Sequence, residues 1–270
     1  MTITRNAYEK HNFIRTSIDL LCAGVSWRGG SFISEEDGKG KNLPAIDEEL
    51  LVEFARSMLL DGKAYVGVTS TEGKFKIEQI PDPDASKSET IITIERVESS
   101  FSPKGEPILE RIGSNIELYE KAFEQHSINP AADEILGYVL PSIHSSLAIP
   151  SSMLDQTRIT QVPVEALMMG AIQYQAEVEQ LRHNLRYGLN QIGDLVAGIL
   201  DIDIVSWEWN ENWIVEGPCK YGYVYQVFKS KGIALSPIMD SELGGMKLAL
   251  QAGLISNHTY SECAASYGLE

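Results

Sequence analysis

Two pairs of aspartates, each with one residue between them, are the side chains of this sequence whose spacing is best suited to chemistry. Asp82 and Asp84 lie in the stretch IPDPD, and Asp201 and Asp203 lie in DID. Carboxylate oxygens at this spacing can bind a divalent cation, which can activate water for hydrolysis. Such pairs also arise by chance in a chain with 38 acidic residues. A metal-dependent hydrolase that uses these four residues is therefore one alternative, and the favoured expectation is no metal site.

The histidines and cysteines show no spacing typical of catalysis or of zinc binding. The three cysteines form no CxxC pair, which is typical of buried thiols in a reducing compartment. His183 follows Arg182 in a helical pattern and is interpreted as a surface or interface side chain. Ser145 and Ser146 follow His144, but adjacency in sequence does not place a nucleophile beside a base in space. The sequence also lacks the common phosphate-loop, dinucleotide, zinc-protease and serine-hydrolase motifs. We therefore expect a protein that is not an enzyme and that uses no cofactor.

The balance of charge argues against tight binding of nucleic acid. The chain has 22 Lys and Arg residues against 38 Asp and Glu residues, which gives a net charge of −16. Proteins that grip DNA or RNA do so with cations that displace counterions, so tight binding is not expected, although DNA could pass an acidic surface without sticking. No apolar run is long enough to span a membrane, and MTITRNAYEKHNF lacks the apolar core of a secretion signal. We expect a location in the cytoplasm.

The first part of the chain predicts helices that lead into a hairpin. Apolar residues at steps of three and four predict a helix from Tyr8 to Val25, and the Gly-rich stretch 27–47 predicts a loop. Asp47 is placed to cap a second helix, which Gly62 ends. Alternating residues around STEGK then predict a hairpin of strands 65–69 and 75–80.

The middle of the chain predicts a second hairpin and then becomes ambiguous. Pro81 and Pro83 interrupt regular structure, and the runs that begin at Glu89 and Glu106 predict two paired strands. Between Asn115 and Pro150, IELYEKAFEQ fits either helix or strand, and DEILGYVLPSIHSSLAIP is apolar but interrupted by Gly137 and Pro141. Three regions follow from this pattern: 1–80 with helix and hairpin, 81–160 with strands and irregular structure, and 161–270.

The strongest periodic signal predicts one long amphipathic helix between Pro163 and Leu200. Such a helix would be about 55 Å long and would need a partner along its length. Gly188, Gly193 and Gly198 indicate a kink or the close approach of another backbone. We expect the apolar stripe to form a subunit interface through Leu167, Ala171, Tyr174, Val178, Leu181 and Leu185.

The last region is rich in aromatic residues and ends in short helices. Val205, Trp207 and Trp209 share one face of a predicted strand, and the tyrosines of YGYVYQVF share a face of another. Aromatic residues at this density usually fill a core, although a stacking platform for bases or sugars is possible. Two short helices are expected at 241–251 and 257–265, the second capped by Ser256 or Asn257. The fold class predicted from these elements is α+β.

Several stretches of the chain resemble the portal proteins of tailed bacteriophages. An early helix, HNFIRTSIDLLCAGVSW, precedes an acidic helix that runs through ARSMLLDGKAYVGV into a hairpin and IPDPD. Portal proteins similarly place a Leu-rich helix end and a glycine before an AYV-like strand. The later part resembles them in SSLAIPSSML, the long helix, IVSWEW and LALQAGLISNHTYSECAASYGLE. The chain is short for a portal, and no stem and clip are placed between Asn115 and Pro150.

The resemblance implies a homo-oligomeric ring, usually of twelve subunits, at one vertex of the virion head. Double-stranded DNA would pass through its axial channel without tight binding. The ring would bind the terminase, the major capsid protein and head-completion or adaptor proteins after assembly in the host cytoplasm. A portal needs no catalytic residues because the terminase hydrolyses ATP. The alternative is a head-tail adaptor or other assembly protein that oligomerises through the long helix without surrounding DNA.

Overall fold

The computed structural model describes residues 3–34, 43–71, 74–81, 83–85, 90–95, 108–155, 161–203, 205–210 and 219–269. The fold class is α+β, as the sequence predicted. The chain divides into two compact units, residues 1–113 with 178–212 and residues 114–177 with 213–270. These units differ from the three consecutive regions predicted from the sequence, because the long helix α9 (Val164–Leu200) contributes to both.

The first unit begins with two helices where the sequence predicted one. Helix α1 (Ile3–Lys10) is followed by α2 (Asn12–Ser26), and the extended backbone of His11 separates them. The apolar side of α2 is buried, including Ile14, Ile18 and Leu21 at steps of three and four residues. The apolar residues at helical spacing in the sequence are therefore the buried ones, but this spacing does not predict the break at His11.

Helix α3 (Glu48–Asp61) begins and ends where the sequence predicted. The Asp47 Oδ1 accepts a hydrogen bond of 2.8 Å from the backbone N–H of Leu50, which satisfies one free donor of the first turn. Gly62 ends the helix with a φ of 75°, and its N–H bonds the carbonyl of Met58 at 3.1 Å. This left-handed conformation is strained for residues with a Cβ atom, so glycine is suited to the position.

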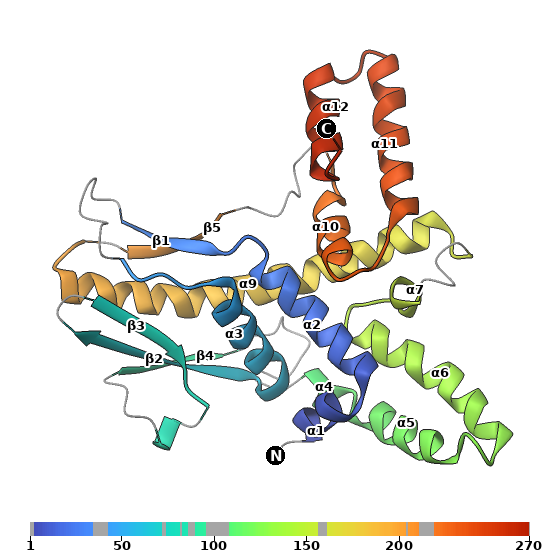
Figure 1. The fold of residues 1–270 in the computed structure, drawn as a ribbon, viewed down its shortest axis with the longest axis horizontal. Helices are drawn as coiled ribbons and strands as arrows, with labels where there is room; N and C mark the ends of the chain where they lie inside the picture. The colour runs from blue at the N-terminus through green and yellow to red at the C-terminus, as the bar shows by residue number, and fades with distance from the viewer. Residues whose placement is uncertain are drawn as a thin grey trace. The chain divides into compact units, whose positions relative to one another are not determined.

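A three-stranded antiparallel sheet follows α3 directly, with strand order β3-β2-β4. Strands β2 (Lys63–Thr71) and β3 (Lys74–Gln79) form the predicted hairpin. Strand β4 (Thr90–Glu95) pairs with the other edge of β2. The predicted second hairpin is therefore wrong, and α4 (Ile108–Arg111) is a helix instead of its second strand. In Figure 1, α3 lies beside this sheet, which explains the buried apolar side of β2.

A second, two-stranded sheet joins parts of the chain that are distant in sequence. Strand β1 (Gly30–Ser34) pairs antiparallel with β5 (Val205–Trp209), so that Gly30 lies opposite Trp209. The loop predicted for 27–47 therefore contains a strand. A Cβ atom on Gly30 would collide with the ring of Trp207, so the pairing needs glycine at this position.

The glycines of α9 in the first unit mark close approaches at two of three positions. A Cβ atom on Gly188 would collide with the side chain of Ile94, and one on Gly193 would collide with the carbonyl group of Val205. Nothing lies within 4 Å of the same atom on Gly198. The sheet elements β4 and β5 therefore pack against α9 where it has no side chain.

The second unit contains the helical hairpin that the sequence left ambiguous. Helices α5 (Gly113–Gln125) and α6 (Pro130–Ser146) are joined by a hydrogen bond of 3.3 Å from the Asn115 Nδ2 to the Ser142 Oγ. The short helix α7 (Ser151–Leu154) follows. The first turn of α6 is capped by an asparagine, Asn129, whose side chain accepts from the backbone of Ala131.

In the described end of the chain, residues 219–269, all regular secondary structure is helical. The stretch YGYVYQVF forms helix α10 (Gly222–Ser230), so the predicted strand is wrong. Its buried residues Val224, Val227 and Phe228 follow helical spacing, which the alternating tyrosines concealed. Helices α11 (Ser236–Gln251) and α12 (Asn257–Ser266) form the antiparallel pair seen in Figure 1. Ser256 caps α12 by accepting from the backbone N–H of Thr259.

None of the helices in the described part of the chain has the length and the apolar composition that a membrane-spanning helix requires.

Candidate functional site

The six residues predicted to form a subunit interface lie in the core of the chain itself. None of them has exposed surface: Leu167, Ala171, Tyr174, Val178, Leu181 and Leu185. Within the second unit, the ring of Tyr174 meets that of Phe228 edge to face, with centroids 5.1 Å apart. A side chain that its own chain covers has no surface left for a neighbour. The interface assignment is therefore corrected, and this stripe stabilises the subunit.

A second face of α9 is exposed and partly apolar. Met169 is 57 % exposed and Ile172 is 41 % exposed, and Ala166 and Ala176 are also exposed. These four residues follow steps of three and four, so they lie on a different side of the helix from the buried stripe, and the exposed Glu165 and Gln173 lie among them. We call this set the open face of α9. It is one exposed part of the long helix, which also carries the exposed Tyr187 and Ile199.

Arg182 holds the end of α2, a role that the sequence pattern did not reveal. Its side chain is buried, and its Nε and Nη2 donate to the carbonyls of Val25 and Trp27 at 3.0 and 2.9 Å. The guanidinium also lies 4.7 Å from the ring centroid of Trp209. The last carbonyls of a helix lack intrahelical donors, and a cation there is favoured by the helix dipole. Arg182 therefore links α9, α2 and β5.

Asn190 connects α9 to the two-stranded sheet in a similar way. Its Oδ1 accepts a hydrogen bond of 2.8 Å from the backbone N–H of Trp207. Both Arg182 and Asn190 lie outside the apolar stripe of the sequence. Their functional partners are backbone groups far away in sequence, and no local pattern identifies them.

Glu242 organises the most connected polar cluster of the second unit. Its Oε1 accepts from the backbone N–H of Lys220 at 2.6 Å, and its Oε2 accepts from that of Tyr221 at 3.1 Å and from the thiol of Cys219 at 3.3 Å. The hydroxyl of Tyr267 donates to the same carboxylate. Burial, followed by this hydrogen bond, raises the pKa of Tyr267. The cluster ties α11 and α12 to the start of α10 and uses a carboxylate where the helix dipole favours one.

The buried cysteines behave as the sequence predicted. Cys22, Cys219 and Cys263 are all buried free thiols. Burial raises the pKa of both Cys219 and Cys263, which keeps the thiols protonated and poorly nucleophilic.

The aspartate pairs lie at exposed positions where they are described. Asp84 lies in a short 3₁₀ turn, and Asp201 and Asp203 follow the end of α9. Asp82 lies outside the described residues. In the described ranges, no three or more His, Cys, Asp or Glu side chains gather where they could hold a metal ion. The hydrolase alternative therefore gains no support from these residues.

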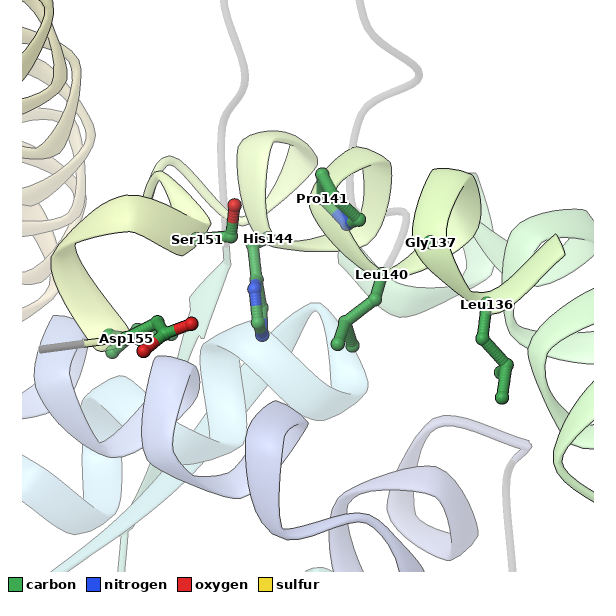
Figure 2. A pocket seen from close by; sticks show the side chains of 8 residues that line it. Leu136, Gly137, Leu140, Pro141, His144, Ser151 and Asp155 are labelled. Carbon is green, nitrogen blue, oxygen red and sulfur yellow. The ribbon is translucent and has the colours of Figure 1, made fainter. Parts of the chain in front are cut away.

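A cavity of about 390 Å³ lies along α6 and α7 in the second unit. Figure 2 shows Leu136, Leu140 and His144 on one side of α6, at intervals of four residues. His144 is buried, and this burial lowers its pKa to about 4, so the imidazole is neutral near pH 7. The cavity is mostly apolar and has polar groups at one end, with Gly137, Pro141, Ser151, Leu154 and Asp155 completing its lining.

The remaining sequence-based expectations concern His183 and the aromatic residues. His183 is exposed on α9, as expected of a surface side chain. Trp207 is fully buried and packs edge to face on Phe32 and Trp209, which agrees with a core role rather than a stacking platform.

No protein-family model matches the chain, and no curated protein matches it at significant similarity. The function is therefore inferred from the residues and surfaces described above.

Proposed function

We propose that this chain is the subunit of a portal ring, through which DNA is packaged into a phage head and later ejected. The proposal joins the portal-like pattern of the sequence to the open face of α9. Its partners would be further copies of the chain, the terminase, the major capsid protein and the head-completion or adaptor proteins. Its location would be the virion, after assembly in the host cytoplasm.

The open face of α9 is the observation that carries the proposal. Exposed apolar area that groups on one face of a helix is typical of a protein interface. Met169 and Ile172 belong to a helix whose other side is already committed to the core. A neighbouring subunit would cover them without disturbing the fold of the chain.

The charge of the chain is compatible with a channel for DNA. With a net charge of −16, the protein offers few contacts that release counterions from a phosphate backbone. A polyanion can then move past the ring without being held. A contact that uses different surfaces on the two partners closes into a ring when the rotation between neighbours permits it.

The mass of the purified protein and its appearance in negative-stain images test this proposal. We expect a closed ring with a central channel and a mass many times the 29.9 kDa of one chain. An oligomer without a channel would favour the adaptor or other assembly protein. A monodisperse monomer across micromolar concentrations would contradict both.

A further inference from the structure

The α5–α6 hairpin of the second unit carries an acidic surface with exposed apolar side chains. Five carboxylates and one lysine lie along the two helices at exposed or half-exposed positions: Glu117, Glu120, Lys121, Glu124, Asp133 and Glu134. Tyr138 is 74 % exposed, and it shares a face of α6 with Glu134 and Ile135, one helical turn away. We call this set the acidic surface. Its charge excludes nucleic acid, and its aromatic and aliphatic groups suit a protein partner.

The helices at the end of the chain carry more exposed lysines than exposed carboxylates. Four exposed lysines lie on or beside α10 and α11: Lys220, Lys229, Lys231 and Lys247. The three carboxylates of the described end of the chain are Asp240, Glu242 and Glu262. Glu242 is already bound to the backbone at the start of α10. We call the four lysines, together with the neighbouring Leu248, the lysine surface.

The middle of α11 leaves room for a closely packed partner beside the lysine surface. Leu248 is 67 % exposed, and it follows Gly244 and Gly245 by one turn. A Cβ atom on either glycine would meet nothing within 4 Å. By contrast, a Cβ atom on Gly222, at the start of α10, would collide with the side chain of Ser266 in the same unit. The space beside α11 is therefore not used by the chain itself.

The acidic and lysine surfaces belong to the same unit but to different parts of it. In Figure 1 the α5–α6 hairpin and the α11–α12 pair extend in different directions. One copy of the chain thus presents two complementary surfaces at separate places. Complementary surfaces at separate places can meet between copies, and such a head-to-tail contact forms a ring when the rotation between neighbours closes.

We propose that the acidic surface of one subunit binds the lysine surface of the next copy of this chain. This inference rests on the proposed ring and identifies the charged surfaces that set the order of subunits around it. Carboxylate–lysine pairs at the rim give orientation and speed of association, while Tyr138, Ile135 and Leu248 supply apolar area. Charged rim pairs also make assembly sensitive to salt.

A pair of charge-reversed proteins tests the proposal. The first carries Glu117→Lys with Glu134→Lys, and the second carries Lys231→Glu with Lys247→Glu. All four positions are exposed, so each protein should keep the circular dichroism and the melting temperature of the wild type. Each alone should lose the high-mass species, because two reversals leave the changed surface with equal numbers of positive and negative side chains and so cancel the attraction at every contact. An equal mixture of the two should regain it, because the contacts of an alternating ring are then of two kinds: one joins the two unchanged surfaces, and the other brings the new lysines of the first protein against the new glutamates of the second.

A matched control carries Asp194→Lys with Lys74→Glu, two exposed positions of the first unit, and should assemble as the wild type does. If the wild type is a ring and either reversed protein also forms full rings, the surfaces are assigned wrongly while the proposed function stands. A mixture that stays dissociated would likewise overturn the pairing. A monomeric wild type would remove the ring and this inference together.

Discussion

Leu167 and Met169 are two residues apart on α9 and face opposite environments. Leu167 has no exposed surface, whereas Met169 is exposed by more than half. The heptad-like pattern in the sequence identifies the first as part of an apolar stripe. It does not say whether the stripe is covered by the same chain or by another one. This difference can be measured with one kind of substitution at both positions.

Leu167→Lys should unfold the subunit, and Met169→Lys should leave it folded but dissociate the ring. A lysine in the core has neither a charged partner nor water around its ammonium group, so the free energy of unfolding falls by about 4 kcal/mol. At Met169 the ammonium group is solvated in the free subunit and meets apolar surface only in the assembly. Thermal melting and sedimentation velocity of both proteins check this. Rings of Met169→Lys with wild-type mass would show that the open face of α9 is not an interface.

Arg182→Gln should destabilise the first unit by about 2 kcal/mol, because the carbonyls of Val25 and Trp27 lose charged donors in a buried place. Arg186 lies one turn later and is exposed, so Arg186→Gln is the matched control. Urea unfolding of both variants measures the difference. Equal stability of the two would mean that water replaces the guanidinium at the end of α2.

Acidification should remove stability through His144. Its pKa is about 4 in the folded chain and near 6.5 when unfolded. Between these two pKa values the unfolded chain binds more protons at His144 than the folded chain does. The contribution of neutral His144 to the free energy of unfolding is therefore complete above pH 6.5 and is lost as the pH falls toward 4. Carboxylates also titrate there, so the wild type is compared with His144→Phe by urea unfolding. The variant should lose less stability on acidification, and the exposed His126→Gln should behave as the wild type does. Identical losses in all three would contradict the neutral state of His144.

At the scale of elements, the sequence predicted those whose signals are local. The cap at Asp47, the glycine end at Gly62 and the hairpin of β2 and β3 depend on neighbours within a few residues. The pairing of β1 with β5 was missed, because its two strands lie far apart in the chain. Helix α10 was mistaken for a strand because tyrosines alternate through it, while its buried residues follow the helical period.

The candidate site was predictable only in part, for the same reason. The sequence placed the long helix and its buried stripe, whose residues 167, 171, 174, 178, 181 and 185 are all covered. It could not separate intramolecular from intermolecular burial. The polar anchors Arg182 and Asn190 bind backbone groups that only the tertiary fold brings near.

Two glycines of α9 should respond to alanine in opposite directions. Gly193→Ala places a methyl group against the Val205 carbonyl and should cost about 2 kcal/mol. Gly198→Ala meets open space within the same helix and should stabilise it by about 1 kcal/mol. Denaturation midpoints give both values. A neutral Gly193→Ala would show that β5 can move away from α9.

At the scale of the whole molecule, the net charge of −16 governs contact with DNA. We expect weak binding of duplex DNA that disappears as salt approaches physiological strength, because few lysines displace counterions. Fluorescence anisotropy of a labelled duplex over a salt series measures this. A tight complex at physiological salt would mean that a local basic surface outweighs the overall charge.

The pairing of β1 with β5 also affects how the protein is made. A ribosome releases the chain from its N-terminus, so β1 emerges long before its partner strand at 205–209 has been synthesised. The segment 178–212 completes the first unit, and the α5–α6 hairpin of the second unit is translated before it. Part of the apolar surface of the early helices therefore stays exposed on the nascent chain until residues 178–212 have been synthesised. Chaperone binding to arrested nascent chains should persist until the codons for β5 have passed, and fall once that strand leaves the exit tunnel.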